Sequence, residues 1–520
     1  MTPEGWGCRS DAKTVAMAVA GVPRVKKLPP RTKIVCTLGP ASDGVAVLRE
    51  MIRAGMSVAR INMSHGQPAE HAARLARLRE AADAEGAIVA VLLDLQGPRL
   101  RLGEVAADTV LVEGQPLTLD GNAAVGGARR VKVSYARSLA EHVQRGQRIL
   151  IDDGRLVLRV VGTGVEDIET EVEVGGPVSS HKGVNLPETP LAILSPTPKD
   201  LQDVTFGLEE AVDFIALSFV SDASQVRALQ QYIRDAGGDV PVIAKIERPE
   251  AVRNLAAIVA QADGVMVARG DLALEIGAAR VPVEQKQIIQ QANEAAIPVI
   301  TATQMLESMI HNALPTRAEA NDVANAIYDG TDAVMLSAET AVGDHPAEVV
   351  AMMAAIAREV ERVLPYEDLG RRGAARRKHT VDGAICEAAV EIARRVHVAA
   401  IIAGTSSGST PRAVAAHRPE MPLVGAAHRA EVARRMALVW GVTPLIIAPY
   451  ATTDEMVGGL IESTAAAGLI GADDRVVITS GQPIGRSGTT SMVQVRFAGD
   501  YLIQDVATRE APADNGRRPR

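Results

Sequence analysis

Aromatic residues, cysteines and long apolar runs are all scarce in this sequence. Phe, Trp and Tyr make up 2% of its 520 residues, so base stacking on aromatic platforms is not expected. The three cysteines, Cys8, Cys36 and Cys386, are too few and too dispersed for a disulfide framework or a zinc site. No apolar run reaches the roughly 18 residues that a membrane span requires. These absences favour a protein of a reducing compartment that crosses no membrane.

The charge balance excludes a further class of partner. Lys and Arg number 55 and Asp and Glu 63, which gives a net charge of −8 and no reason to expect nucleic-acid binding. The N-terminus lacks the charged-then-apolar order of a signal peptide, so we expect a cytoplasmic protein. Hydrophobic residues make up 47%, enough for sizeable cores built from Ala, Val, Ile and Leu.

Eight short apolar runs alternate with helical stretches, which predicts parallel βα units and a (β/α)₈ TIM barrel. We assign residues 30–97 and 186–366 to this barrel, after a flexible tail at 1–29. The runs are Lys33–Thr37, Val58–Asn62, Val89–Asp94, Phe214–Ser218, Val242–Glu247, Val265–Arg269, Val299–Thr303 and Ala333–Ser337.

Two regions fall outside the barrel pattern. Residues 98–185 alternate Val and Thr with charged residues, which predicts a small inserted β-barrel or sandwich that acts as a lid at the barrel mouth. Residues 367–510 return to α/β character and predict a C-terminal regulatory domain, followed by a flexible tail at 511–520.

The run from Val242 to Glu247 carries a lysine and a carboxylate near its C-terminal end. Side chains alternate along a strand, so Lys245 and Glu247 face the same way. Burying these charges is costly without a partner. They form either a structural ion pair or a metal-holding carboxylate beside a phosphate-clamping lysine.

The ends of the other predicted strands favour the second interpretation. Strand ends converge on one face of a barrel, where Glu247 and Asp271 could hold a divalent ion. Arg60 and Lys245 would then face an anionic ligand, an arrangement suited to phosphoryl transfer. The other polar residues delivered there are Asn62, Ser64, Asp94, Arg269, Thr301, Thr303, Ser337 and Glu339.

The sequence resembles the pyruvate kinase family along nearly all of residues 31 to 500. Several long motifs in the right order make this resemblance specific. They are Lys33–Ser42, Ala59–Gly66, Lys245–Glu247, Met266–Leu272, Thr301–Met309 and Pro315–Glu319.

The resemblance implies transfer of a phosphoryl group from phosphoenolpyruvate to ADP. Arg60 would grip that group and Lys245 would neutralise it in the transition state. Glu247 and Asp271 would hold Mg²⁺ or Mn²⁺. Thr303, with the Gly270 and Asp271 amides, would seat the substrate carboxylate.

The family also implies a proton donor and a nucleotide site. Thr303, with Ser337, would deliver a proton to the enolate. His65, Arg101 and Lys199 match positions near the nucleotide phosphates, together with Arg60. His65 is equally explained as a loop histidine, and Lys199 as a solvated surface lysine.

One departure from the family pattern concerns the monovalent cation. Many members hold K⁺ with residues matching Asn62, Ser64 and Asp94. In those members a Thr directly follows the Asp, and a Glu stands four residues after the Thr. Here Leu95 replaces the Thr, and Arg99 stands where the Glu would be. An arginine brings a fixed positive charge, so we expect Arg99 to substitute for K⁺ and make K⁺ unnecessary.

The C-terminal region carries a run of Gly, Ser and Thr before a predicted helix. This run suits a phosphate nest, although a helix N-cap turn explains it equally well. In the family this place binds a phosphorylated effector, covered by the loop 481–490, and the family implies a homotetramer. The candidate effector residues are Thr405, Ser406, Ser407, Gly408, Ser409, Thr410 and Arg486.

Two other functions remain open from the residues alone. A metal-dependent barrel lyase or aldolase for enolpyruvate-type substrates would also use a Glu/Asp pair, but would need neither a lid nor a nucleotide. A non-catalytic metabolite sensor would retain the fold without turnover.

Overall fold

The computed structural model describes residues 29–98, 100–122, 124–189, 195–374, 380–481 and 490–502. These residues divide into two units, one holding 30–374 with 434–441 and the other holding residue 29, 380–433 and 442–502. The predicted tails, apart from residue 29, lie outside the described residues.

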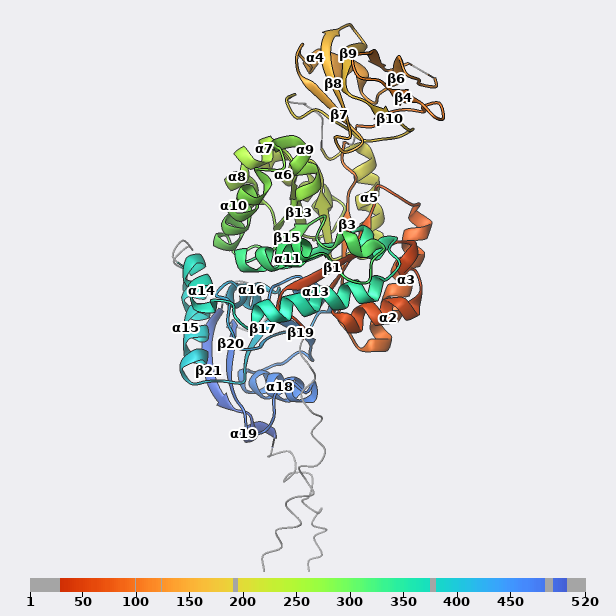
Figure 1. Ribbon diagram of the computed structural model, residues 1–520. Helices are drawn as coiled ribbons and strands as arrows, with labels where there is room; N and C mark the ends of the chain where they lie inside the picture. The colour runs from red at the N-terminus through yellow and green to blue at the C-terminus, as the bar shows by residue number, and fades with distance from the viewer. Residues whose placement is uncertain are drawn as a thin grey trace, which may run out of the picture. The chain divides into compact units, whose positions relative to one another are not determined.

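The first unit contains a closed barrel of eight parallel strands (Figure 1). β16 pairs with β1 in register, Lys33 opposite Ala333, which closes the ring. This confirms the predicted (β/α)₈ barrel. In spatial order the strands are β1 (Lys33–Thr37), β2 (Val58–Asn62), β3 (Ala90–Asp94), β12 (Phe214–Leu217), β13 (Val242–Ile246), β14 (Gly264–Ala268), β15 (Val299–Ala302) and β16 (Ala333–Leu336).

The barrel strands are apolar on both faces, so their outer faces are covered by helices. One apolar core lies between strands and helices, and a second, which includes Val35, Leu92 and Met335, fills the barrel interior. The principal helices are α2 (Val45–Ala54), α3 (Pro68–Glu85), α5 (Pro198–Glu209), α6 (Ala223–Asp235), α8 (Leu255–Gln261), α10 (Val281–Glu294), α11 (Arg317–Asp329) and α13 (Pro346–Glu361).

The region inserted after β3 is built of strands, as predicted. It forms a six-stranded sheet and a two-stranded sheet around one apolar core that includes Leu119, Leu158 and Ile168. In spatial order the six strands are β11 (Val184–Asn185), β7 (Arg148–Ile151), β8 (Leu156–Thr163), β9 (Asp167–Val174), β5 (Pro116–Asp120) and β6 (Arg130–Lys132). The two-stranded sheet pairs β10 (Gly176–Pro177) with β4 (Val110–Leu111). The helix α4 spans Ala136–His142.

The second unit is an α/β sheet with its own apolar core. Its strand order is β19 (Val442–Ile446), β18 (Leu423–Ala427), β17 (Ala400–Thr405), β20 (Arg475–Gly481) and β21 (Thr490–Phe497), with only β21 antiparallel to its neighbour. Its helices include α15 (Val381–Arg395), α16 (Ser409–Ala415) and α18 (Thr453–Ala466).

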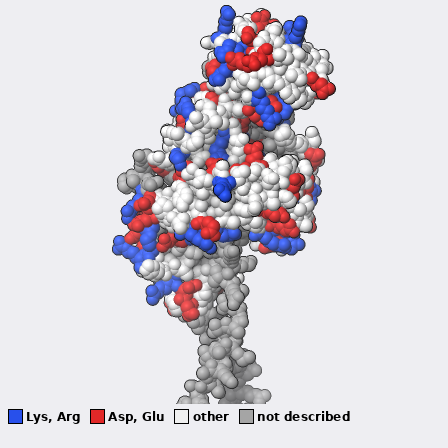
Figure 2. Space-filling view, in the orientation of Figure 1, with Lys and Arg blue, Asp and Glu red and all other residues white. Residues whose placement is uncertain are grey.

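The segment 434–441 comes from the C-terminal part of the sequence but packs with the barrel unit. Ala437 and Leu438 belong to the core inside the barrel, and Arg434 forms an ion pair with Asp213 at 2.8 Å. No described helix is long and apolar enough to cross a membrane. Acidic and basic side chains are interspersed on the face shown in Figure 2.

Candidate active site

The carboxyl ends of three barrel strands bring three predicted charged residues together. Arg60 lies on β2, Asp94 ends β3 and Lys245 lies on β13. Arg60 Nε donates to Asp94 Oδ2 at 2.7 Å, and Lys245 Nζ lies 3.2 Å from Asp94 Oδ1. The Asp94 carboxylate therefore sits between both cations that the sequence placed near the substrate.

Lys245 is almost enclosed, with 11% of its side chain exposed. Burial by itself would lower the pKa of Lys245, but the nearby Asp94 and Glu247 carboxylates outweigh it and raise that pKa above its ordinary value. Burial by itself would raise the pKa of Asp94, yet Lys245 and Arg60 hold it below its ordinary value. Each group therefore keeps its charge without exposure to water.

Ser218 is a contact of Lys245 that sequence reasoning missed. Its Oγ accepts a hydrogen bond from Lys245 Nζ at 2.7 Å and donates to the carbonyl of Leu95 at 2.7 Å. Ser218 directly follows β12, so its position at a strand end was the available signal. Thr37 was missed in the same way, and its Oγ1 accepts from Arg60 Nη1 at 2.9 Å.

Glu247 directly follows β13 and is 1% exposed. Its Oε2 accepts the amide of Phe219 at 2.7 Å, and its Oε1 lies 2.8 Å from Lys245 Nζ. Burial raises the pKa of Glu247, Lys245 opposes this shift, and Asp271 adds to it. The Asp271 carboxylate is therefore close enough to disfavour a second negative charge.

The carboxylates of Glu247 and Asp271 fit a divalent cation. Glu247 Oε1 is already paired with Lys245 Nζ at 2.8 Å, but the repulsion between the Glu247 and Asp271 carboxylates would be relieved by a cation between them. Among the described residues, no group of three or more His, Cys, Asp or Glu is arranged to hold a metal ion by itself. A pair of carboxylates completed by ligand oxygens and waters is what Mg²⁺ prefers.

Thr303 and Gly270 meet where β14 and β15 end. The Gly270 amide donates to Thr303 Oγ1 at 2.8 Å, and Thr303 Oγ1 donates to the carbonyl of Ala302 at 2.6 Å. A Cβ on Gly270 would make only ordinary contacts, the nearest at 3.5 Å to Thr303 Oγ1, so packing alone does not require glycine here. Asp271 follows in α9 (Arg269–Ile276).

Ser337 stands at the end of β16, just before the short helix α12 (Ala338–Ala341). Its amide donates to Glu339 Oε2 at 2.6 Å, and the amide of Leu306 donates to Glu339 Oε1 at 3.2 Å. Burial raises the pKa of Glu339 above its ordinary value. Glu339 therefore joins the end of β16 to the segment that follows Thr303.

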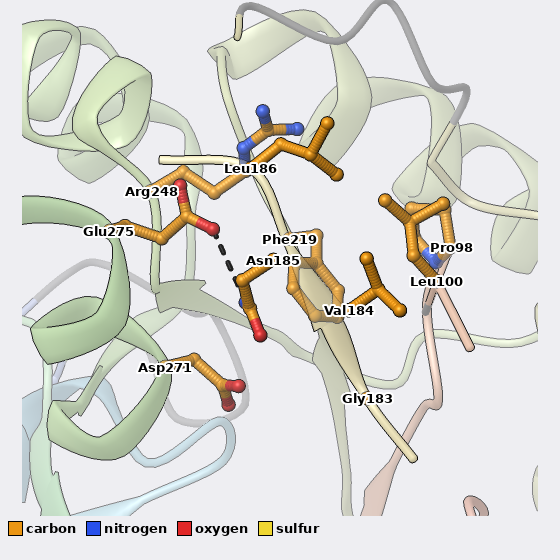
Figure 3. A pocket seen from close by; sticks show the side chains of 10 residues that line it. All are labelled: Pro98, Leu100, Gly183, Val184, Asn185, Leu186, Phe219, Arg248, Asp271 and Glu275. Carbon is orange, nitrogen blue, oxygen red and sulfur yellow. Dashed lines mark hydrogen bonds between the residues drawn. The ribbon is translucent and has the colours of Figure 1, made fainter. Parts of the chain in front are cut away.

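A pocket opens between the inserted region and the barrel (Figure 3). Asp271 and Glu275 line it from α9, and Asn185 lines it from β11. Asn185 Nδ2 donates to Glu275 Oε1 at 3.3 Å, which the dashed line in Figure 3 marks. Asn185, Arg248 and Glu275 are pocket residues that the sequence analysis did not select.

The predicted nucleotide residues have protein partners. Lys199 Nζ forms an ion pair with Asp203 at 2.5 Å and donates to the carbonyl of Met63 at 3.1 Å. His65 is exposed, and its carbonyl lies 2.8 Å from His71 Nε2. Arg101 belongs to the inserted region, and its Nη1 donates to the carbonyl of His181 at 2.9 Å.

The residues of the predicted monovalent-cation position are partly described. Asn62 Oδ1 accepts the amide of Ser64 at 3.1 Å, and Leu95 is buried with 1% exposed. Asp94 already pairs with Arg60 and Lys245. Arg99 lies outside the described residues.

The predicted effector run extends from Thr405, the last residue of β17, to Thr410 in the first turn of α16. Thr405 Oγ1 accepts the amides of Ser407 at 3.3 Å and Gly408 at 2.9 Å, and Thr410 is buried with its Oγ1 2.7 Å from Thr490 Oγ1. Gly408 has a left-handed φ of +84°. The Thr405 contacts support the turn interpretation, whereas Thr410 contacts β21 instead, and Ser406 and Ser409 are half-buried. Arg486 lies outside the described residues.

Comparison with known proteins identifies the family. The model "Pyruvate kinase, barrel domain" matches residues 29–350, and "Pyruvate kinase, alpha/beta domain" matches residues 383–496. A pyruvate kinase of Geobacillus stearothermophilus is 43% identical over 478 residues, which cover 91% of this chain and 81% of the relative. "Pyruvate kinase 2" of Synechocystis sp. is 43% identical over 484 residues, which cover 92% and 81%. These findings confirm the resemblance, and the chain belongs to the pyruvate kinase family.

Proposed function

We propose that this protein transfers the phosphoryl group of phosphoenolpyruvate to ADP and releases pyruvate and ATP. The observation that carries the proposal is the enclosed group of Arg60, Asp94, Lys245 and Glu247 at one rim of the barrel. Two fixed cations beside buried carboxylates suit a reaction whose catalysis is mostly positioning and neutralisation of charge.

Arg60 and Lys245 bind and neutralise the transferring phosphoryl group. Asp94 holds both cations in place, so little reorganisation is needed when charge develops on the phosphoryl oxygens. Glu247 and Asp271 would hold Mg²⁺ or Mn²⁺, which would supply positive charge to neutralise the anionic substrate.

Thr303 and the Gly270 and Asp271 amides seat the substrate carboxylate. The enolate left after transfer must gain a proton on carbon, and the Thr303 hydroxyl, with Ser337, directs that proton through an ordered water. His65, Arg101 and Lys199 receive the ADP phosphates. The lid of residues 98–185 excludes water from the site.

Arg99 takes the place of K⁺ in this proposal. Its support is the buried Leu95 where K⁺-dependent relatives are expected to carry Thr, together with the two cations already on Asp94. Activity should be the same in Na⁺ and K⁺ buffers, and a large activation by K⁺ would refute the substitution.

A phosphorylated metabolite regulates the enzyme through residues 404–412 and Arg486, and the active form is a homotetramer in the cytoplasm. Ser406 and Ser409 are the hydroxyls best placed for an effector. Thr405 and Thr410 are held by protein partners, whereas Ser409 accepts a hydrogen bond from Ser407 Oγ at 3.1 Å and can still donate its own proton to a phosphate. Ser406→Ala with Ser409→Ala should abolish activation by the sugar phosphate that activates the wild type. Unchanged activation would place the effector elsewhere.

The decisive experiment couples pyruvate release from phosphoenolpyruvate and ADP to lactate dehydrogenase, with Mg²⁺ present. Turnover that requires ADP and is abolished by EDTA supports the proposal. A lyase or aldolase would consume an enolpyruvate substrate without forming ATP. A sensor would show binding without turnover.

A further inference from the structure

One buried guanidinium binds three successive carbonyl groups of the turn that carries Thr303. Arg269 Nε donates to the carbonyl of Ala302 at 3.2 Å, and its Nη2 donates to those of Thr303 at 2.6 Å and Gln304 at 3.4 Å. Its side chain is 10% exposed, and its Nη1 forms an ion pair with Asp322 of α11 at 2.7 Å.

The turn held in this way has an unfavourable backbone conformation. Thr303 has a φ of +68° and Gln304 a φ of +53°. Left-handed conformations cost a non-glycine residue about 1–3 kcal/mol, and they persist only where the surroundings impose them. Threonine is β-branched, so its position in this region is especially unfavourable. The hydrogen bonds from Arg269 to three carbonyls of the turn hold Thr303 and Gln304 in this conformation.

We propose that Arg269 is a positioning residue that sets the place of the Thr303 hydroxyl. It directly precedes Gly270, whose amide donates to that hydroxyl, so one residue joins the end of β14 to the turn after β15. The Arg269–Asp322 pair anchors the guanidinium on its far side. The inference rests on the proposed function, in which Thr303 seats the carboxylate and directs the proton.

The chemistry of this contact requires arginine. A planar guanidinium presents several N–H donors in fixed directions, whereas an ammonium is a compact point charge. Arg269→Lys keeps the charge near Asp322 but cannot reach three carbonyls at once. The turn would then relax toward a less strained conformation and move the Thr303 hydroxyl.

The test compares Arg269→Lys with the wild type in steady-state assays. Because a displacement of about 1 Å costs about 10²-fold, kcat/KM for phosphoenolpyruvate should fall about 100-fold while KM for ADP changes less than about twofold. Exchange of the pyruvate methyl hydrogens in D₂O, followed by proton NMR with Mg²⁺ and ATP, should fall about as much. Loss of packing alone would not selectively lower kcat/KM for phosphoenolpyruvate and the exchange rate while leaving KM for ADP nearly unchanged.

Arg74→Lys is the matched control, because Arg74 is similarly buried and pairs with Asp43 at 2.6 Å. It should lower thermal stability as much as Arg269→Lys without a selective loss for phosphoenolpyruvate. Asp322→Asn leaves Arg269 in place and should cost about 10-fold in kcat/KM, because the anchor of the guanidinium is weakened. It also provides a test if Arg269→Lys fails to fold.

Three outcomes would contradict the inference. One is kcat/KM and exchange within about threefold of wild type for Arg269→Lys. Another is an equal loss for Arg74→Lys, and the third, should Arg269→Lys fail to fold, is an unimpaired Asp322→Asn variant. Absence of turnover in the wild type would overturn the proposed function itself, and this inference with it.

Discussion

At the scale of single residues, the charge of Lys245 provides the sharpest test of the site. Lys245→Met removes the ammonium while keeping a stem of similar shape. Since the charge acts mainly as the phosphoryl group transfers, kcat should fall by at least about 10³-fold with KM for phosphoenolpyruvate changed much less. Steady-state kinetics at saturating Mg²⁺ measure both constants. Near-normal turnover would remove Lys245 from the mechanism.

Lys33 allows a prediction about stability and pH. It begins β1, is 3% exposed, and burial lowers its pKa from 10.5 to about 8, although Glu361 opposes that shift. The charged form is therefore penalised in the folded state, by on the order of 3 kcal/mol below pH 8. The penalty fades as pH rises from about 8 to 10.5, because the folded protein loses this proton first. Above 10.5 both states are neutral.

The variant Lys33→Met should consequently unfold at a higher temperature than the wild type at pH 7. Its advantage should shrink between pH 8 and 10.5, where the wild-type lysine loses its proton. Glu361 keeps partners in the variant, since it also accepts the amides of Arg31 and Thr32. Thermal unfolding followed at several pH values measures the difference, and a pH-independent difference would contradict the assignment.

At the scale of elements, the strands were predictable and the turns between them were not. Apolar runs such as Val242–Ile246 identify β13 locally, and the alternation of side chains correctly placed Lys245 and Glu247 on one face. The left-handed φ of Thr303 depends on Arg269, a contact between segments 34 residues apart. No local pattern in the sequence encodes such a contact, so the sequence identified Thr303 as a site residue but not the contact of Arg269 with its turn.

The turn after β3 gives a prediction at this scale. Gly97 has a φ of +69°, and a Cβ there would lie 2.8 Å from Phe219 Cδ2 and 2.9 Å from Ser218 Cβ. Gly97→Ala should displace Ser218 and Phe219, which hold Lys245 and Glu247. We expect at least about a 10-fold loss of kcat and a higher Mg²⁺ requirement, because small displacements of catalytic groups are costly.

Gly86→Ala is the matched control for that turn. Gly86 has a comparable φ of +58° at the end of α3, but a Cβ there would meet nothing within 4 Å. The variant should lose about 1 kcal/mol of stability from backbone strain and keep its activity. Equal activity losses in both variants would mean that strain, and not the contact with Ser218 and Phe219, is responsible.

At the scale of the whole molecule, the chain order conceals which parts form one core. From the sequence, residues 434–441 fall within the range 367–510 assigned to the C-terminal α/β region, because a local pattern does not reveal which core a segment joins. In the structure they pack with the barrel unit, where Leu438 is fully buried in the interior core with Val35 and Met335. The barrel core is therefore completed by residues about 100 positions beyond β16.

This arrangement predicts which strands a cavity at position 438 would destabilise. Leu438→Ala should destabilise the protein by about 2–5 kcal/mol, as large-to-small changes in cores do. Hydrogen exchange should then accelerate in peptides of β1 and β16, far from position 438 in sequence. Leu460→Ala is the matched control, because Leu460 is equally buried in the core of the other unit and should affect β17 and β20 instead. If Leu438→Ala accelerates exchange only in the second unit, the segment does not support the barrel.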